Sequence, residues 1–505
     1  MAVTQDKKAS ELTAPVSIAD TDVIAGYRPG TGGEPNADIR MAVGLIRDQV
    51  PASGIVSAAD AAAGRPAQRL DAIIAAHTVN QRAFAGPLVA QIGDSRHANG
   101  ILAASPAFGR TMQSAGSWIE FLSFGRVKAP PSYNMAVGGT SPSDLDGQIT
   151  NVLALSPRPT HCAILTGTNA INNASTVTGL LSGMQADFQA AWSRLLTYGI
   201  IPITCLDLPR QWTDTTLTAL VKRRIHNQLN NWLRQAAPRY RSLLIDPIWQ
   251  LTDPASSTGE CLTSLYYAEA TKIHPGPTGG YIVGGLYKDL FESMGLPPRY
   301  VGLGRGDFYD ATNNPQGNLI PDGGTMYNSA GTVSGGTPPT GTVPTGWILR
   351  NDLSFAGLSC VGSLEARTDG PGNWFKVVAT ATGGPATVLI YNQTTYNLSI
   401  GDTIQFGIDV IFDSSSGVNQ CAVSVEDRTA AGAAVNRGHY AMQYGTAATI
   451  GTFQPTFAGR AITDPLTLGA SWVTVRHGAS IQLNPGGSFT ARFGAAELRK
   501  VFASI

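Results

Sequence analysis

The sequence predicts a multidomain protein in which an α/β/α domain, a parallel sheet with helices on both faces, precedes an all-β sandwich. Short apolar runs alternate with amphipathic segments over 86–300, the pattern of parallel strands joined by crossover helices. Short runs with a period of two, separated by turn residues, fill 346–505, which is typical of a sandwich. A chain of 505 residues is long enough for two or three domains.

Four strands and four helices are expected in the α/β/α domain. The strands are Leu88–Ile92, His161–Thr166, Ile200–Leu206 and Ser242–Ile245, and the helices lie near 116–124, 178–198, 214–236 and 278–294. The carboxyl ends of parallel strands share one edge of a sheet, and a site is expected there.

The other segments differ in composition. Residues 1–56 are polar and rich in turn residues, so we expect no compact core there. Residues 57–85 have helical spacing and predict a connecting or oligomer-forming helix. Gly, Thr, Pro and Asn dominate 301–345, which predicts a linker or long loops. The strands expected beyond it are Trp374–Thr380, Thr387–Tyr391, Thr403–Phe412, Cys421–Val425, Trp472–Arg476 and Ser488–Phe493.

Composition excludes several classes of partner. The 35 Lys and Arg residues balance 35 Asp and Glu residues and form no basic run, so neither a nucleic acid nor an anionic membrane is expected to bind. No stretch approaches the length of a membrane span, and the amino terminus lacks the apolar core of a signal peptide. If the protein acts outside a cell, we expect it to leave by another route. The 57 Gly residues and the low charge suit an extracellular or particle-associated protein.

The five cysteines predict neither a metal site nor a disulfide framework. They are odd in number and far apart, and no histidine lies near them at ligand spacing. Cys162 and Cys205 fall in apolar strands and are expected to be core residues.

The run PLVAQIGDSRH, Pro87–His97, is an apolar strand that ends in Gly-Asp-Ser. A serine at the end of a strand, on a tight turn into a helix, points its hydroxyl out of the sheet while its backbone N–H faces the same cleft. Acyl transfer needs this geometry, so Ser95 is a candidate nucleophile. The tripeptide alone also occurs in ordinary turns.

A second run, NMAVGGT, carries Gly138 and Gly139. Paired glycines let the backbone approach a ligand closely and free an N–H to act as an oxyanion donor, although a plain turn is the alternative. The third run ends a strand in Gly-x-Asn and places the amide of Asn169 at the sheet edge, for catalysis or as a helix cap.

The fourth run, Ile273–Pro275, places His274 just before a helix, where it can act as a general base or be structural. The four runs occur in one order and are separated by 44, 30 and 105 residues. Such an arrangement is much harder to obtain by accident than any one run.

Together these runs resemble the conserved blocks of the SGNH/GDSL hydrolase superfamily, over about 215 residues of the chain. The resemblance implies a flavodoxin-like fold and an ester substrate. It also implies that Ser95 is the nucleophile and His274 the base. The oxyanion hole would then consist of the N–H groups of Ser95 and Gly139 and the side chain of Asn169.

The chain departs from the family before the histidine. The family usually has Asp-x-x-His, where an acid orients the imidazole, but this chain has Thr271 three residues before His274. Three alternatives follow. His274 bonds a backbone carbonyl and works as a dyad with Ser95, or Glu269 or a distant carboxylate replaces the acid. In the third, the domain is a poor enzyme whose main role is binding. Ala170 also replaces the acid that commonly follows the asparagine in the family, a residue that supports the loop.

Three residues near these runs are candidate substrate contacts. Arg96 is expected either to meet an anionic sugar or to be a surface charge. His97 is expected to touch substrate, to cap a helix or to be solvated. Gly138 is a candidate because its backbone can approach a ligand.

The flanking parts carry weaker resemblances. Asp20–Tyr27 and the return at Ile39–Leu45 are similar to the amino-terminal attachment segment of bacteriophage tail fibres and tailspikes. That similarity implies a place in the virion tail, contact with tail or baseplate proteins, and a homotrimer. The carboxyl-terminal region resembles the jelly-roll sandwiches of carbohydrate-binding modules, in which Trp347, Trp374 or Tyr391 would either stack on sugar rings or lie in the core.

We therefore expect a phage tail-associated esterase that removes O-acetyl groups from a bacterial surface polysaccharide and needs no metal or organic cofactor. One alternative is a tail protein that is catalytically inactive and binds surface glycan. Another is a bacterial extracellular carbohydrate esterase.

Overall fold

The computed structural model describes residues 86–99, 111–112, 114–296, 299, 306–322, 324–352, 357–443 and 453–501. The chain divides into two units, Met1–Ala83 and Phe84–Ile505, and every described residue belongs to the second. The expected attachment segment 1–56 and helix 57–85 lie outside the described residues. No described helix is long and apolar enough to cross a membrane.

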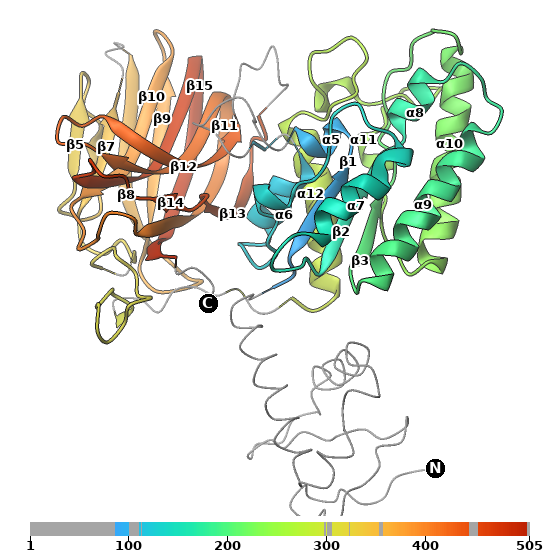
Figure 1. Cartoon of the computed structure of the whole chain (residues 1–505). Coiled ribbons are helices and arrows are strands. Elements are labelled where there is room, and N and C mark those ends of the chain that lie inside the picture. The colour runs from blue at the N-terminus through green and yellow to red at the C-terminus, as the bar shows by residue number, and fades with distance from the viewer. Residues whose placement is uncertain are drawn as a thin grey trace, which may run out of the picture. The chain divides into compact units, whose positions relative to one another are not determined.

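A parallel sheet forms the centre of the amino-terminal part of this unit (Figure 1). Its strands lie in the order β1 (Val89–Gly93), β2 (His161–Leu165), β3 (Ile201–Cys205) and β4 (Leu243–Ile245). These are the four parallel strands that the sequence predicted. Two isolated parallel bridges, Leu88 with Lys128 and Gln91 with Asn134, place one further segment along the free side of β1. The glycines that follow this segment therefore emerge at the same edge of the sheet as Ser95.

The helices of this part are α5 (Ser95–Ala98), α6 (Ala115–Leu122), α7 (Leu145–Leu153), α8 (Thr168–Asn173), α9 (Leu180–Thr197), α10 (Ala219–Arg239), α11 (Ile248–Leu251) and α12 (Pro277–Ser293). Short 3-10 turns are η2 (Pro131–Tyr133), η3 (Pro142–Asp144) and η4 (Thr263–Leu265). The four predicted helices correspond to α6, α9, α10 and α12, with shifted ends. Helices α7 and α8 were not predicted.

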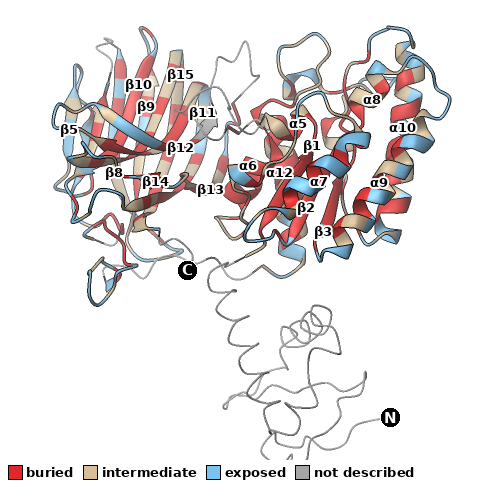
Figure 2. Ribbon diagram, in the orientation of Figure 1, coloured by how far each residue is buried: buried red, intermediate tan, exposed pale blue. Residues whose placement is uncertain are grey.

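Both faces of the parallel sheet are buried, because successive side chains of a strand point to opposite faces. Ile92 and Ile164 pack with residues of α7, α9 and α10 on one face. Val89 and Leu165 pack with residues of α6 and α12 on the other. Figure 2 shows these strands buried along almost their whole length, which is why they read as continuous apolar runs in the sequence.

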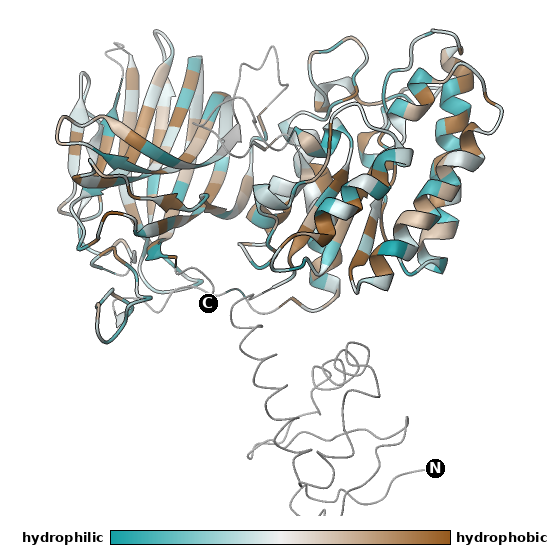
Figure 3. Cartoon of the chain, in the orientation of Figure 1, coloured by the Kyte–Doolittle hydropathy of each residue, from teal (hydrophilic) through white to brown (hydrophobic). Residues whose placement is uncertain are grey.

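The described residues of the carboxyl-terminal part form eleven strands. They are β5 (Thr332–Gly335), β6 (Thr340–Gly341), β7 (Trp347–Asn351), β8 (Leu358–Ala366), β9 (Asn373–Ala381), β10 (Ala386–Thr394), β11 (Thr403–Arg428), β12 (Ala434–Gln443), β13 (Phe457–Ile462), β14 (Leu466–Thr467) and β15 (Thr474–Lys500). Exposed and buried positions alternate along β8, and Figure 3 shows the matching alternation of polar and apolar residues in these strands.

Two very long strands join the two sheets of this sandwich. The first half of β11 pairs with β13, and its second half pairs with β12. The first half of β15 pairs with β10, and its second half pairs with β9. Register shifts around Phe412–Gln420 interrupt the pairing of β11 with β15, and such bulges bend strands. The sequence predicted two separate strands in each case, and each pair is one continuous strand.

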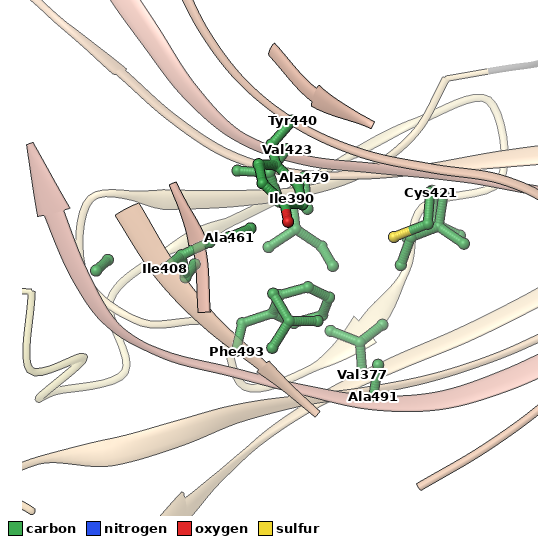
Figure 4. Packing of buried hydrophobic residues seen from close by; sticks show 14 of the residues in the cluster. Val377, Ile390, Ile408, Cys421, Val423, Tyr440, Ala461, Ala479, Ala491 and Phe493 are labelled. Atoms are coloured by element: carbon green, nitrogen blue, oxygen red, sulfur yellow. The ribbon is translucent and has the colours of Figure 1, made fainter. Parts of the chain in front are cut away.

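The core of the sandwich lies between the two sheets. Figure 4 shows Phe493 and Val377 from one sheet facing Ile390 and Val423 from the other, and all four are fully buried. Apolar side chains thus interdigitate across the two layers, as in other sandwiches.

Of the two alternatives for 301–345, a linker or long loops, the described residues 306–322 and 324–345 correspond to long loops with two short strands, packed on the sandwich. Leu319, Ile320 and Val343 belong to the sandwich core. The Asn318 side chain accepts a hydrogen bond from the Leu498 N–H at 2.9 Å and donates one to the carbonyl of Ala496 at 2.9 Å. A segment rich in Gly, Thr and Pro is therefore an integral part of the sandwich, because a few apolar residues and one amide anchor it.

Candidate active site

The end of β1 forms a tight turn that only glycine allows. Gly93 has φ +122°, and a Cβ on it would lie 1.9 Å from the carbonyl oxygen of Leu165 on β2. Asp94 then caps α5 by accepting a hydrogen bond from the Arg96 N–H at 3.1 Å. Ser95 is the first residue of this short helix, at the carboxyl edge of the sheet.

The structure brings His274 to this serine across 179 residues of chain. His274 Nε2 lies 2.7 Å from Ser95 Oγ. Its other ring nitrogen, Nδ1, lies 2.9 Å from Oε2 and 3.1 Å from Oε1 of Glu269. Serine, imidazole and carboxylate therefore form one continuous hydrogen-bonded line, the geometry of an activated nucleophile.

Glu269 is held by the loop that carries the histidine. Its Oε1 accepts hydrogen bonds from the backbone N–H groups of Ile273 and His274, at 2.5 and 2.6 Å. Burial alone would raise the pKa of Glu269, but the hydrogen bonds from the His274 ring and from these two N–H groups lower it below its ordinary value. The carboxylate therefore stays ionised at neutral pH.

Among the alternatives for the missing acid, the geometry favours Glu269. The His274 Nδ1 atom contacts this carboxylate rather than a backbone carbonyl. Lys272 lies between them with φ +44°, a left-handed conformation that turns the chain back so that Glu269 reaches His274 from five residues away. The sequence pointed to Glu269 because it is the nearest acidic residue before His274.

The proposed oxyanion donors lie around Ser95. Gly139 has φ +81°, and a Cβ on Gly138 would lie 3.8 Å from the Cβ of Ser95, so this loop passes directly beside the serine. Asn169 Nδ2 donates one hydrogen bond to the carbonyl of Thr140 at 2.9 Å and keeps a second N–H. Within the described residues, the backbone N–H groups of Ser95 and Gly139 have no hydrogen-bond acceptor.

Arg96 and His97 do not face the site, and these two predictions are corrected. Arg96 is 3% exposed and His97 is 1% exposed, so neither is a surface charge or a solvated side chain. The His97 ring lies 2.9 Å from the carbonyl of Ile92 through Nδ1, and burial lowers its pKa to about 4. The contact with Ile92 holds His97 inside the fold, and two buried carboxylates hold Arg96 there.

Arg96 instead joins two carboxylates beneath the serine. Its guanidinium donates to Asp94 at 2.9 and 2.6 Å and lies 2.5 Å from Asp207, which follows β3. Burial works against this charge, but the Asp207 and Asp94 carboxylates hold the pKa of Arg96 above its ordinary value. His226 and Asn230 of α10 bind the backbone of Asp207. The sequence motif gave no sign of this buried network.

The three aromatic residues considered for sugar stacking are buried in the sandwich. Trp347 is 1% exposed, Trp374 is 5% exposed and Tyr391 is 8% exposed. Arginine side chains cover the rings of Trp374 and Tyr391, each at 3.9 Å from the centroid. Their role is therefore packing, the second of the two expected alternatives.

The cysteines are all buried and free, as expected for Cys162 and Cys205. Over the described ranges, no three or more His, Cys, Asp and Glu side chains are grouped so that they would hold a metal ion.

The sequence matches no protein-family model and no curated protein. Solved structures do resemble it. A G-D-S-L family protein from Desulfitobacterium hafniense shares 21% identity and covers 41% of this chain and 99% of its own, with a TM-score of 0.31. An acetylxylan esterase from Geobacillus stearothermophilus shares 16% identity over 42% of this chain and 95% of its own, with a TM-score of 0.30.

A β-sandwich carbohydrate-binding module shares 15% identity over 30% of this chain and 56% of its own, with a TM-score of 0.23. The strand order and register of this chain itself define the parallel sheet and the sandwich.

Proposed function

We propose that the α/β/α domain is a serine esterase of the SGNH type, with Ser95 as nucleophile, His274 as general base and Glu269 as the acid that orients the histidine. The observation that carries this proposal is the line of hydrogen bonds from Ser95 Oγ through the His274 ring to Glu269. A carboxylate on the far ring nitrogen fixes the tautomer in which Nε2 can accept the serine proton.

The reaction would proceed through an acyl-enzyme. Ser95 Oγ bonds to the carbonyl carbon of the ester while His274 Nε2 takes its proton, and Glu269 stabilises the imidazolium. The N–H groups of Ser95 and Gly139 and the free amide N–H of Asn169 donate to the oxyanion. The intermediate collapses and expels the alcohol, which takes the proton from His274. Water, deprotonated by His274, then attacks the acyl carbon; the C–Oγ bond breaks, Ser95 Oγ takes the proton back from His274, and the acid is released.

We further propose an O-acetyl group on a bacterial surface polysaccharide as the substrate, and a phage tail as the protein's location. The tail-fibre-like segments at Asp20–Tyr27 and Ile39–Leu45 support the location, and so does the extracellular type of composition. In this proposal the amino terminus attaches to tail or baseplate proteins, the chain forms a homotrimer, and the sandwich binds glycan or assembles the fibre. A bacterial extracellular carbohydrate esterase would use the same site.

The binding-only alternative rested on Thr271 standing where an acid is usual. The contact of the Glu269 carboxylate with His274 supports the esterase proposal over this alternative.

The test is the release of acetate from an O-acetylated bacterial polysaccharide by the purified protein and by its Ser95→Ala variant. We expect acetate from the first and none above background from the second. Alkali-treated polysaccharide, which has lost its esters, is the matched substrate control. Equal acetate from both proteins would refute Ser95 as the nucleophile.

A further inference from the structure

The side chain of Gln148 binds the backbone of the turn that precedes Ser95. Gln148 lies in the second turn of α7 and is 5% exposed. Its Oε1 accepts a hydrogen bond from the Gly93 N–H at 2.6 Å, and its Nε2 donates one to the Gly93 carbonyl at 3.0 Å. The amide therefore pairs with both backbone polar groups of Gly93, as a residue of a neighbouring antiparallel strand does.

The orientation of this amide follows from its partners. Gly93 offers one donor and one acceptor, so Oε1 must face the N–H and Nε2 the carbonyl. The reversed orientation would place two donors and two acceptors against each other in a buried site, where unpaired polar groups are costly.

The same amide reaches the loop of Gly139. Gln148 Nε2 lies 3.2 Å from Thr140 Oγ1, and that hydroxyl lies 2.9 Å from the Gly93 carbonyl. The carbonyl of Thr140 in turn accepts the hydrogen bond from Asn169. A chain of hydrogen bonds thus runs from the serine turn through Gln148 and Thr140 to Asn169.

We propose that Gln148 is a positioning residue that keeps the three proposed oxyanion donors in their positions relative to one another. Ser95 follows Gly93 by two residues. Gly139 directly precedes Thr140, and the Asn169 side chain donates to the Thr140 carbonyl. Gln148 binds both polar groups of Gly93 and the Thr140 hydroxyl. It adds to two direct bonds from this loop to the Gly93 carbonyl, one from the Val137 N–H at 3.0 Å and one from the Thr140 hydroxyl at 2.9 Å. Since it contacts none of the reacting atoms, it acts through the backbone that it fixes. This inference rests on the proposed esterase function.

The first test is the kinetics of Gln148→Leu with p-nitrophenyl acetate. Leucine has a similar size but no hydrogen-bonding groups, so the Gly93 N–H loses its acceptor and the Thr140 hydroxyl loses a donor, while the direct bonds to the Gly93 carbonyl remain. We expect kcat to fall roughly 10- to 100-fold with KM changed less than about twofold, because misplaced donors weaken binding of the transition state rather than of the substrate. Asn151→Leu, an exposed position on α7, is the matched control.

Gln148→Glu gives a second readout. When protonated, a carboxyl group has one donor and one acceptor and can pair with Gly93 as the amide does; when ionised, it cannot donate. We expect kcat of Q148E, relative to that of the unmodified protein, to fall as the pH rises. A merely structural role would give a ratio independent of pH.

Crystal structures separate failure of this inference from failure of the esterase proposal. In Q148L we expect the Gly139–Thr140 loop to move away from Ser95, whether or not the protein cleaves esters. An unmoved loop, or an active protein in which Q148L keeps its kcat, would overturn the role of Gln148. An unmodified protein no more active than Ser95→Ala would instead overturn the proposed function.

Discussion

In the proposed active site, Glu269 takes the place of the acid that the sequence lacks at Thr271. The expected spacing of three residues suits an acid on one regular turn before the histidine, whereas here the loop folds back at Lys272 and uses a spacing of five. Motif spacing could name Ser95, Gly139, Asn169 and His274 as candidates, because each lies next to a strand or helix that is recognisable from its apolar pattern. It left the acid open, because the conformation of an irregular loop has no such pattern.

Replacing Glu269 with glutamine should lower kcat about 10²- to 10⁴-fold with p-nitrophenyl acetate, because an amide neither fixes the productive tautomer nor stabilises the imidazolium. Steady-state kinetics of the variant give this value directly.

The matched control is Glu260→Gln. Glu260 lies just before η4, in the connection between α11 and α12 that also carries Glu269, and pairs with Arg223 at 2.6 Å, so its loss should leave kcat within about twofold. If E269Q were as active as E260Q, the histidine would work without its carboxylate.

At the scale of elements, Arg96 connects the start of α5 with the end of β3. Arg96→Met should lower the free energy of unfolding by about 3–5 kcal/mol, because it leaves Asp94 and Asp207 buried without their cation. Thermal or urea unfolding measures the loss.

Arg194→Met is the comparison for this experiment. Arg194 pairs with the exposed Asp146 at 2.5 Å, and such surface pairs contribute only about 0–1 kcal/mol. Equal losses in the two variants would contradict the structural role of the buried network.

The elements themselves were predictable to different degrees. The strands of the parallel sheet were recognisable because both of their faces are buried, so each reads as an apolar run. The continuity of β11 and β15 was not, because polar residues at the bends interrupt the alternation. Composition left a linker and long loops open for 301–345, because it does not reveal that Leu319, Ile320 and Val343 are anchored in a core.

At the scale of the whole molecule, buried histidines predict sensitivity to acid. Burial lowers the pKa of His161 and His439 to about 4 and that of His477 to about 3, well below the ordinary 6.5. The unfolded chain therefore binds more protons than the folded chain, so stability is lost as the pH falls below about 6.5. Each such histidine lowers the free energy of unfolding by up to about 1.4 kcal/mol per pH unit.

His477→Phe should make this dependence shallower. His477 is fully buried among the rings of Trp347, Tyr396 and Phe406, so phenylalanine suits the site and cannot be protonated. Between pH 7 and 5 we expect the variant to lose about 2 kcal/mol less in total than the unmodified protein, measured by urea unfolding of the sandwich. Parallel pH profiles would show that this histidine does not titrate on unfolding.

The central claim is that Ser95 is a nucleophile activated by His274 and Glu269. Mass spectrometry after incubation with diethyl p-nitrophenyl phosphate tests it most directly, because the reagent phosphorylates activated serines and stays attached. We predict one adduct, on the peptide that contains Ser95, and a much slower reaction in His274→Ala. No adduct on Ser95, or labelling at the same rate in His274→Ala, would contradict the claim.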